Sequence, residues 1–232
     1  MSSDIINFYN QYLEAFSIKD PSAVGWTDES TQHKRFKALF GIGISDGDRI
    51  LDYGCGLGHL NNYIALNGFK SISYVGVDIN PNYIAMAKQL YPDDGIFMVG
   101  DIESVKVNPG VEYVIGSGVF TYGITLDEVI SKIEVAYDLC FRGVAFNFLN
   151  KKSGLDGLLM YDPKEITNRL SHIGDVTVVS GYLGDEDFTI YIKKINIWMT
   201  IELIGVIWKK LIKICLMLKD TKNFILKKLE NL

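Results

Sequence analysis

Cysteine is scarce in this sequence. Its 232 residues include three cysteines, Cys55, Cys140 and Cys215, and no two of them have the close spacing of a metal-binding or redox pair. This spacing argues against a disulfide framework and against a structural zinc site, and it fits a reducing compartment. We therefore predict a cytoplasmic protein with no bound metal ion.

Signals for secretion and for membrane insertion are also lacking. The first residues, MSSDIINFYNQYLEAF, contain neither a positively charged start nor an apolar stretch, so we expect no secretory signal. A membrane-spanning helix needs ~20 mostly apolar residues. The longest uncharged stretch of the apolar C-terminal tail is well short of that length, so the sequence disfavours a chain that crosses a membrane.

Positive charge is sparse outside the C-terminal tail. Residues 1–194 carry a net charge of −9, whereas residues 195–232 contain seven Lys against three Asp and Glu, a net charge of +4. The acidic body makes nucleic acid an unsuitable partner. The apolar, lysine-rich tail fits an amphipathic helix that is peripheral at the inner membrane face, and equally a helix that docks on its own domain or forms a homodimer.

The sequence does have a regular alternation of strands and helices. Two helices are predicted over residues 4–17 and 29–40, and from Arg49 onward apolar, β-branched runs alternate with helical patterns. Such strands predict a parallel sheet covered on both faces. Near the end, VTVVSGYLG and FTIYIKK are separated only by DED, which is typical of an antiparallel hairpin. We predict an α/β fold: a doubly wound, mostly parallel seven-stranded sheet that ends in this hairpin.

Three closely spaced glycines follow the first predicted strand. In RILDYGCGLGHL, Gly54, Gly56 and Gly58 stand where the strand gives way to a helix. Glycine permits positive φ and lets a ligand approach the backbone closely, and a helix N-terminus favours an anionic group. A dinucleotide fingerprint would require glycine at position 59, where this chain has His59. A nicotinamide-dependent oxidoreductase is therefore disfavoured.

The segment LDYGCGLG resembles motif I of the class I S-adenosylmethionine (SAM) dependent methyltransferases, and the resemblance extends over residues 49–194. It implies that Asp52 lies near the methionine part of SAM and that Asp78 binds the ribose hydroxyls. It also implies that Asp101 meets the adenine amino group, with Ile102 against the ring. The cofactor-binding residues expected on this basis are Asp52, Gly54, Cys55, Gly56, Gly58, Asp78, Ile79, Asp101, Ile102 and Ser117.

Methyl transfer requires the acceptor to be aligned with the methyl group and the sulfur. In doubly wound sheets ligands lie beyond the carboxyl ends of the strands, so we expect the acceptor beside Phe120, Tyr122, Asn147 and Asn150. Plain core packing is an equal alternative for the two aromatic residues. The loop lacks the NPPY or DPPY sequence of related enzymes that methylate nucleic-acid amino groups. This favours a small-molecule acceptor, with a glycan or sugar-nucleotide precursor as the leading hypothesis.

The segment VGWTDESTQHKRF resembles the lid of some small-molecule methyltransferases. The resemblance implies that Gln32 or Arg35 reaches the methionine carboxylate, and an exposed helix face is the alternative. A general base titrating near neutrality is most often an imidazole, and we assign His33 to this role. No base is needed if the acceptor is an amine or an anionic oxygen.

These patterns divide the chain into a helical lid (1–44), a SAM-binding domain (45–194) and a helical tail (195–232). The expected activity is transfer of a methyl group from SAM to a hydroxyl or amine of a small molecule. The alternative is a noncatalytic SAM-binding protein or a membrane-associated scaffold that keeps the fold for its tail. The intact set of Asp52, Asp78 and Asp101 favours the enzyme.

Overall fold

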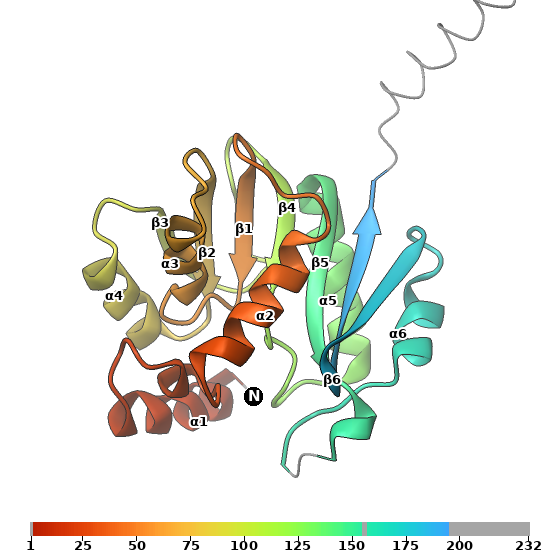
Figure 1. Cartoon of the computed structure of the whole chain (residues 1–232), viewed down its shortest axis with the longest axis horizontal. Helices are drawn as coiled ribbons and strands as arrows, with labels where there is room; N and C mark the ends of the chain where they lie inside the picture. The colour runs from red at the N-terminus through yellow and green to blue at the C-terminus, as the bar shows by residue number, and fades with distance from the viewer. Residues whose placement is uncertain (1, 155–156, 195–232) are drawn as a thin grey trace, which may run out of the picture. The chain divides into compact units, whose positions relative to one another are not determined.

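Helices and strands alternate along residues 2–154 and 157–194, which are the residues that the computed structural model describes (Figure 1). The helical elements are α1 (Ser2–Ala15), η1 (Pro21–Val24), α2 (Glu29–Phe40), α3 (His59–Leu66), α4 (Pro81–Leu90), α5 (Leu126–Leu139), η2 (Lys151–Ser153) and α6 (Pro163–Leu170). The strands are β1 (Arg49–Tyr53), β2 (Ser73–Asp78), β3 (Ile96–Val99), β4 (Val111–Gly116), β5 (Cys140–Leu149) and β6 (Val176–Lys193).

Side-chain caps determine where several helices begin. The Asp28 carboxylate accepts a hydrogen bond from the Thr31 amide at 2.8 Å and so caps α2. Asn80 caps α4 ahead of Pro81 by accepting a hydrogen bond from the Asn82 amide at 3.0 Å. Each cap satisfies one of the amide groups that the first turn of a helix leaves without a partner.

The sheet has the strand order β3-β2-β1-β4-β5-β6, and the pairs from β3 to β5 are parallel. The last element, β6, folds back on itself (Figure 1), and its second arm, from Asp187 to Lys193, pairs antiparallel with β5. Counted as two arms, β6 completes the seven-stranded sheet with a terminal hairpin, so the predicted fold is confirmed. The chain reverses its direction of crossover between β1 and β4, which creates a crevice at their carboxyl ends.

Hydrophobic clusters cover both faces of the sheet. On one face the helices α2, α3 and α4 pack on residues such as Ile50 of β1 and Tyr113 of β4. On the other face α5 and α6 pack on residues such as Leu51 and Val114. Neighbouring residues of one strand therefore serve opposite cores, because successive side chains of a strand point to opposite faces.

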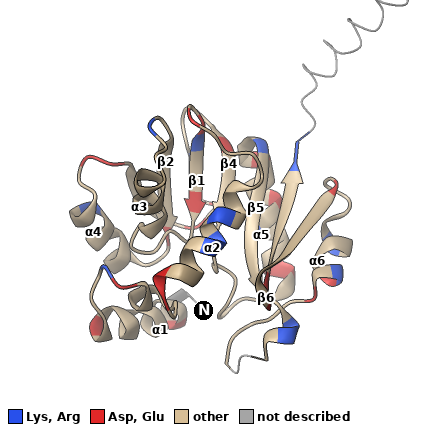
Figure 2. Cartoon of the chain, viewed as in Figure 1, with Lys and Arg blue, Asp and Glu red and all other residues tan. Residues whose placement is uncertain are grey.

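The helix α1 lies beyond the carboxyl end of β1, where the arrowhead of that strand points (Figure 1). An acidic residue stands near this arrowhead (Figure 2), and Asp52 is the acidic residue of β1. The end of the sheet that the topology opens is therefore both covered by a helix and acidic.

The predicted tail, residues 195–232, lies outside the residues that the structure describes. Within the described part of the chain, no helix is long and apolar enough to cross a membrane.

Candidate active site

A cavity of about 910 Å³ lies at the carboxyl ends of β1 and β4. Its walls come from α1, the start of α2, the glycine loop, the ends of β2 and β5, and the turn of β6. Pockets for small molecules and cofactors typically span roughly 300–1,000 Å³. This cavity is at the upper end of that range, so it is large enough for a cofactor and a second small molecule.

The glycine loop forms the floor of the cavity with bare backbone. Gly54, Gly56 and Gly58 all have positive φ, of 76°, 52° and 77°. A Cβ atom on Gly54 would lie 2.5 Å from a methyl carbon of Val119, in the loop after β4. The loop therefore needs glycine both for its conformation and for this close approach.

Cys55 and Gly58 contribute to the loop from its buried side. Cys55 is buried, burial raises its pKa, and its sulfur packs beside Gly76 of β2. A Cβ atom on Gly58 would lie 2.8 Å from the ring of Phe97, so this glycine packs on the core. Cys55 lines the cavity as a small residue with a thiol that stays protonated, which does not suit a nucleophile.

Asp78 ends β2 with its carboxylate at the cavity. One oxygen accepts a hydrogen bond from the Gly56 amide and the other from the Asn80 amide, both at 2.8 Å. Burial raises the pKa of Asp78 to about 6, although these two hydrogen bonds lower it. Each oxygen keeps a lone pair for a further donor, which fits the two neighbouring hydroxyl groups of a ribose.

Asp52 lies deeper, at the end of β1. It is 3% exposed, and the Tyr74 hydroxyl donates a 2.7 Å hydrogen bond to one of its oxygens. Burial raises the pKa of Asp52 to about 7. A buried carboxylate of this kind gains most from a positively charged partner, which fits the ammonium group of SAM.

Asp101 follows β3 and is held by a hydroxyl and by a cation. The Tyr53 hydroxyl donates to its Oδ1 at 2.7 Å, and Lys132 Nζ lies 2.7 Å from its Oδ2. Burial raises the pKa of Asp101, but the hydrogen bonds from Lys132 and Tyr53 outweigh this and lower it. Asp101 is therefore ionised, with its carboxylate fixed at the cavity wall.

The segment ahead of β1 does form a wall of the cavity. Gln32 and Arg35 are 3% and 5% exposed, and both line it. Gln32 Nε2 donates to His59 Nδ1 at 3.2 Å. Trp26 packs against Gly118, where a Cβ atom would lie 2.5 Å from its ring. The alternative of an exposed helix face does not apply to these side chains.

Arg35 is anchored on two sides. Its Nε donates to the buried carboxylate of Asp187 in β6, and its guanidinium lies 4.3 Å from the centre of the Trp26 ring. Neither Nη atom bonds another described residue, and neither is among the fully buried unpaired atoms. Because Arg35 lines the cavity, these two nitrogen atoms are available to a ligand there.

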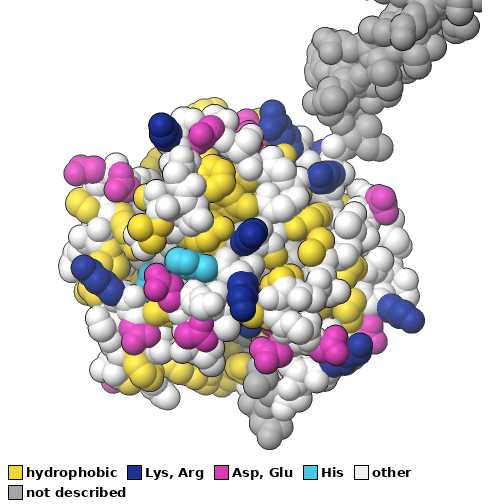
Figure 3. Space-filling view, in the orientation of Figure 1, with side chains coloured by type: hydrophobic (Ala, Val, Ile, Leu, Met, Phe, Trp, Pro, Cys, Tyr) yellow, Lys and Arg dark blue, Asp and Glu magenta, His cyan; other side chains and the backbone are white. Residues whose placement is uncertain are grey.

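The assignment of His33 as general base is corrected by its position. Its ring lies edge-on against Tyr63, and its Nε2 lies 3.6 Å from Glu29 one turn earlier in α2. The side chain is 30% exposed, and histidine is visible on the outer surface of this face (Figure 3). His33 lies on the side of α2 that faces away from the cavity because Gln32 and Arg35 occupy the inner side.

His59 lines the cavity, but both of its ring nitrogens are occupied. Nε2 lies 3.2 Å from the carbonyl oxygen of Ile18, which only accepts, so Nε2 carries the proton and Nδ1 accepts from Gln32. Burial lowers the pKa of His59. It is a neutral structural residue that joins α3 to the lid segment.

Three predicted contact residues lie in the packed interior instead of on the cavity wall. Phe120 is 1% exposed among Tyr53 and Phe146, and Ile102 is 1% exposed in the same core. Asn147 Nδ2 donates to Thr189 at 2.6 Å between β5 and β6. Core packing, the alternative reading of Phe120, is the correct one.

Asn150, Tyr122 and Ser117 take different positions. Asn150 caps η2 by accepting from the Lys152 amide, which is a structural role. Tyr122 lines the cavity and stacks on Phe8 of α1 with 4.0 Å between the ring centres. Ser117 also lines it, and its hydroxyl is fully buried without a hydrogen-bond partner among the described residues. Ile79 lines the cavity beside Asp78.

The helix α1 belongs to the segment predicted as a lid (1–44), but the sequence predicts none of its individual contacts. Asn10 Oδ1 accepts from Asn80 Nδ2 at 2.9 Å, and the Tyr9 hydroxyl lies 3.2 Å from the Thr121 hydroxyl. The Tyr83 hydroxyl donates to the Tyr9 carbonyl oxygen at 3.0 Å. These contacts hold α1 over the part of the cavity that Asp78 and Thr121 line. The amphipathic pattern of α1 predicts a helix, but nothing in it identifies the surface on which the helix packs.

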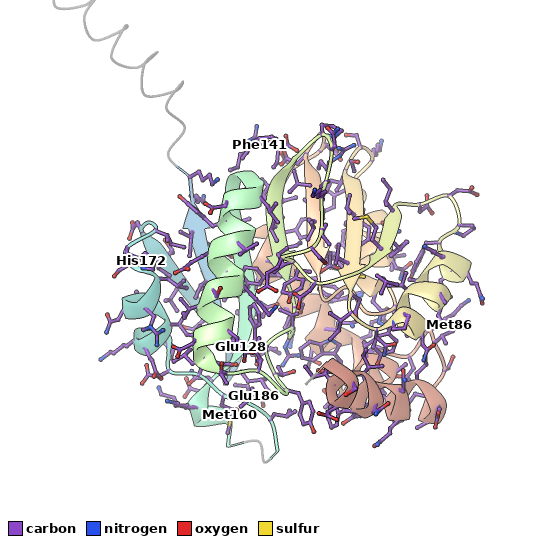
Figure 4. All side chains as sticks on the ribbon, turned by 180° about the vertical axis from the view of Figure 1, so that it is seen from behind. Met86, Glu128, Phe141, Met160, His172 and Glu186 are labelled. Carbon is purple, nitrogen blue, oxygen red and sulfur yellow. The ribbon has the colours of Figure 1, made fainter. Side chains whose placement is uncertain are left out.

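The cavity is strongly acidic. Glu128 at the start of α5 and Glu186 at the turn of β6 lie at the same end of the molecule (Figure 4) and line it together with Asp52, Asp78 and Asp101. The lining cations are Arg35 and Lys132. An acidic wall favours a cationic ligand such as a sulfonium. No cluster of three or more potential metal ligands is present among residues 2–154 and 157–194.

Comparisons with known proteins agree with this geometry. Residues 44–155 match the family model for a methyltransferase domain, Methyltransf_31. The curated protein Rv1506c of Mycobacterium tuberculosis, named as a methyltransferase, is 28% identical over 165 residues, which are 66% of this chain and 97% of that protein.

Two solved structures share the fold. Magnesium protoporphyrin IX methyltransferase from Synechocystis PCC 6803, with bound SAM, has a TM-score of 0.56 and 17% identity over 72% of this chain and 79% of that one. CalS10, an amino pentose methyltransferase from Micromonospora echinaspora with bound SAM, has a TM-score of 0.54 and 16% identity over 70% and 89%.

The family match covers the strands and loops that carry the three carboxylates and the glycine floor. The donors and acceptors around the cavity fit SAM, which is the cofactor. The chain therefore contains a class I, Rossmann-like methyltransferase domain, and it is a SAM-dependent methyltransferase.

Proposed function

We propose that the protein methylates a hydroxyl or amine of a small molecule, and that a glycan or sugar-nucleotide precursor is the first acceptor class to test. The observation that carries the proposal is the continuity of one cavity from the cofactor carboxylates to the loop after β5, where Leu149, Ser153 and Leu158 line it. CalS10, which shares the fold, is an amino pentose methyltransferase.

The residues of the chain would act mainly by binding and orientation. SAM supplies the methyl group on a good leaving group, so catalysis depends on the alignment of the acceptor. Asp78 would accept the ribose hydroxyls, Asp52 the ammonium group, and the Arg35 Nη atoms the methionine carboxylate. Trp26 and α1 would exclude water from the cavity.

In place of His33, Glu186 is the candidate residue to accept a hydrogen bond from the acceptor's hydroxyl or ammonium group. Its carboxylate lines the cavity at the turn of β6 and makes no hydrogen bond or ion pair with another described residue. A carboxylate there can hold a hydroxyl or an ammonium group. We expect Glu186→Gln to raise KM for the acceptor while leaving SAM affinity unchanged.

Calorimetric titration with SAM, its demethylated product S-adenosylhomocysteine (SAH) and NAD tests the cofactor half of the proposal. We expect micromolar binding of SAM and SAH, no binding of NAD, and a loss of at least tenfold in Asp78→Ala. A folded protein that binds neither SAM nor SAH contradicts the proposal.

The acceptor half is tested by following SAH formation with panels of acceptors. Neutral sugars, amino sugars and sugar nucleotides form one panel, and planar aromatic acids and porphyrins form another. Turnover confined to the second panel contradicts the carbohydrate class and leaves the methyltransferase activity intact.

We also propose that the lysine-rich tail holds the enzyme at the cytoplasmic face of the inner membrane. Its composition supports this proposal: seven lysines lie among apolar residues and two tryptophans in residues 195–232. Docking on the protein's own domain and pairing of two chains remain the competing arrangements.

A further inference from the structure

Lys132 stands at the cavity wall in contact with two carboxylates. It lies on α5, its side chain is 12% exposed, and it lines the cavity together with Asp101 and Glu103. Nζ lies 2.7 Å from Asp101 Oδ2 and 3.3 Å from Glu103 Oε2. Two of the three ammonium hydrogens are thereby used, and one remains.

The Asp101 carboxylate can accept one more hydrogen bond. Its Oδ1 already accepts from the Tyr53 hydroxyl and the Ile102 amide, each at 2.7 Å. Its Oδ2 accepts from Lys132 alone among the described residues. A carboxylate oxygen accepts about two hydrogen bonds, so Oδ2 can take one more. A free acceptor position and a free donor therefore lie side by side on the wall.

The edge of adenine has the complementary pair. Its exocyclic amino group is a donor, and the ring nitrogen beside it is an acceptor. Hypoxanthine, in which oxygen replaces the amino group, presents an acceptor at that position. A wall with one acceptor and one adjacent donor therefore distinguishes the two bases.

We propose that Lys132 is a specificity-determining residue that reads the adenine edge of SAM jointly with Asp101. Asp101 Oδ2 accepts from the amino group, and Lys132 donates to the neighbouring ring nitrogen. This inference rests on the proposed binding of the cofactor's adenosine beside Asp78 and Asp101.

The proposal is tested by the ratio of two affinities. The full-length protein is titrated with SAH and with S-inosylhomocysteine, its deaminated analogue. A good two-point contact to a base edge discriminates by roughly ten- to a hundredfold, so we expect the wild type to prefer SAH by about that factor. In Lys132→Met we expect SAH binding to weaken about tenfold, analogue binding to change little, and the ratio to fall.

Three further variants separate recognition from stability. Lys132→Arg keeps a donor and is expected to retain most of the preference for SAH. Lys132→Gln keeps an uncharged donor and is expected to retain part of the preference for SAH. It also takes the place of Lys132→Met in the test if that variant fails to fold. Glu103→Gln removes the second carboxylate contact of Lys132 but leaves Lys132 able to donate. Its ratio of SAH affinity to S-inosylhomocysteine affinity should therefore equal the wild-type ratio.

The outcomes discriminate between this inference and the function on which it rests. A structural ion pair alone would weaken both ligands equally, so an unchanged ratio in folded Lys132→Met and Lys132→Gln overturns the inference and leaves the methyltransferase assignment standing. A wild type that binds SAH and the inosine analogue equally also overturns it. A wild type that binds neither ligand overturns both.

Discussion

Among single residues, Asp52 and Asp78 differ from ordinary surface carboxylates because burial raises the pKa of each. The values are about 7 for Asp52 and about 6 for Asp78. Both groups therefore change charge close to physiological pH, which makes cofactor binding sensitive to pH.

We predict that affinity for SAM increases as the pH rises from 5 to 8. At pH 5 both carboxyl groups are mostly protonated, and at pH 8 both are mostly ionised. A protonated Asp52 offers no charge to the cofactor's ammonium group, so affinity should rise about tenfold for each pH unit below 7 and then level off. Calorimetry at constant ionic strength measures this profile.

Tyr74→Phe is the matched variant for the pH profile. The Tyr74 hydroxyl donates to Asp52 and lowers its pKa, so removing it should move the midpoint to higher pH. A wild-type profile that is flat between pH 5 and 8 would contradict an ionised Asp52 as a binding group.

Stability of the cofactor-free protein should change in the opposite direction. Both pKa values are higher in the folded protein than the usual value of about 3.9 for unfolded Asp, so the folded state binds more protons between pH 4 and 7. The free energy of unfolding therefore falls as the pH rises through this window. Urea unfolding at pH 5 and pH 7 measures the difference in the free energy of unfolding between the two conditions. Saturating SAM should make this difference smaller.

Gly118 is predicted to be intolerant of alanine. Its φ is 69°, and a Cβ atom would lie 2.5 Å from the Trp26 ring that supports Arg35. Backbone strain at such a position costs about 1–3 kcal/mol, and displacement of Trp26 should also weaken SAM binding. Thermal unfolding and SAM titration of Gly118→Ala measure the two effects.

Gly181→Ala provides the matched control for Gly118→Ala. Gly181 has a φ of 88°, but nothing lies within 4 Å of the Cβ position. It should show the strain alone, with normal SAM affinity. Equal SAM affinity in the two variants would contradict a role for Trp26 in the cavity wall.

At the level of helices and strands, α1 differs from the rest because it packs on loops of the site and not on the sheet. Tyr9 and Asn10 bond Thr121, Asn80 and Asn82. A 14-residue helix is marginal on its own in water. Its order therefore depends on tertiary contacts: these hydrogen bonds and the stacking of Phe8 on Tyr122.

We predict that Asn10→Ala loosens α1. The variant loses the hydrogen bonds from Asn80 and Asn82, and a net loss of about 0.5–1.5 kcal/mol for a hydrogen bond gives roughly three- to tenfold weaker SAH binding. Hydrogen exchange should become faster across residues 2–15. Asn82→Ala removes one of the two bonds and should have the smaller effect, and unchanged exchange in both variants would contradict this account.

The order and type of the elements follow from the sequence, but the direction of many side chains does not. Apolar runs, helix caps and the hairpin spacing are local signals, and they predict the strands and α2 closely. The carboxylates Asp52, Asp78 and Asp101 are predicted by the resemblance to the methyltransferase family, in which acidic residues stand at these strand ends. Which side of a loop faces the cavity depends on tertiary packing.

Phe120 and Tyr122 illustrate that limit. They are two residues apart in one loop, yet Phe120 is in the core and Tyr122 is at the cavity. His33 and Gln32 are adjacent on α2, but Gln32 lines the cavity and His33 does not. Lys132 carries no signal in the sequence, since a single lysine on a helix is ordinarily a solvated residue.

On the scale of the whole molecule, the charge is divided between an acidic body and a basic tail. We predict that the full-length protein sediments with vesicles rich in phosphatidylglycerol but not with phosphatidylcholine vesicles. Each lysine near an anionic surface contributes about 1 kcal/mol, and salt screens this attraction. Binding should therefore fall in 0.5 M salt.

Lys209→Glu combined with Lys213→Glu is the matched variant for vesicle binding. It should reduce sedimentation with anionic vesicles and leave SAH affinity unchanged. A protein that is dimeric in solution and ignores both kinds of vesicle would contradict the membrane proposal and favour pairing of two chains through the tail.

The walls of the cavity are held together by hydrogen bonds between residues that are far apart in the sequence. Asn10 bonds Asn80 across 70 positions, Tyr9 bonds Thr121 across 112, and Arg35 bonds Asp187 across 152. Contacts this distant form slowly because a large loop must close first. During synthesis Arg35 leaves the ribosome long before Asp187 is made, so the methyl donor has no finished site to enter until the sheet behind it has closed.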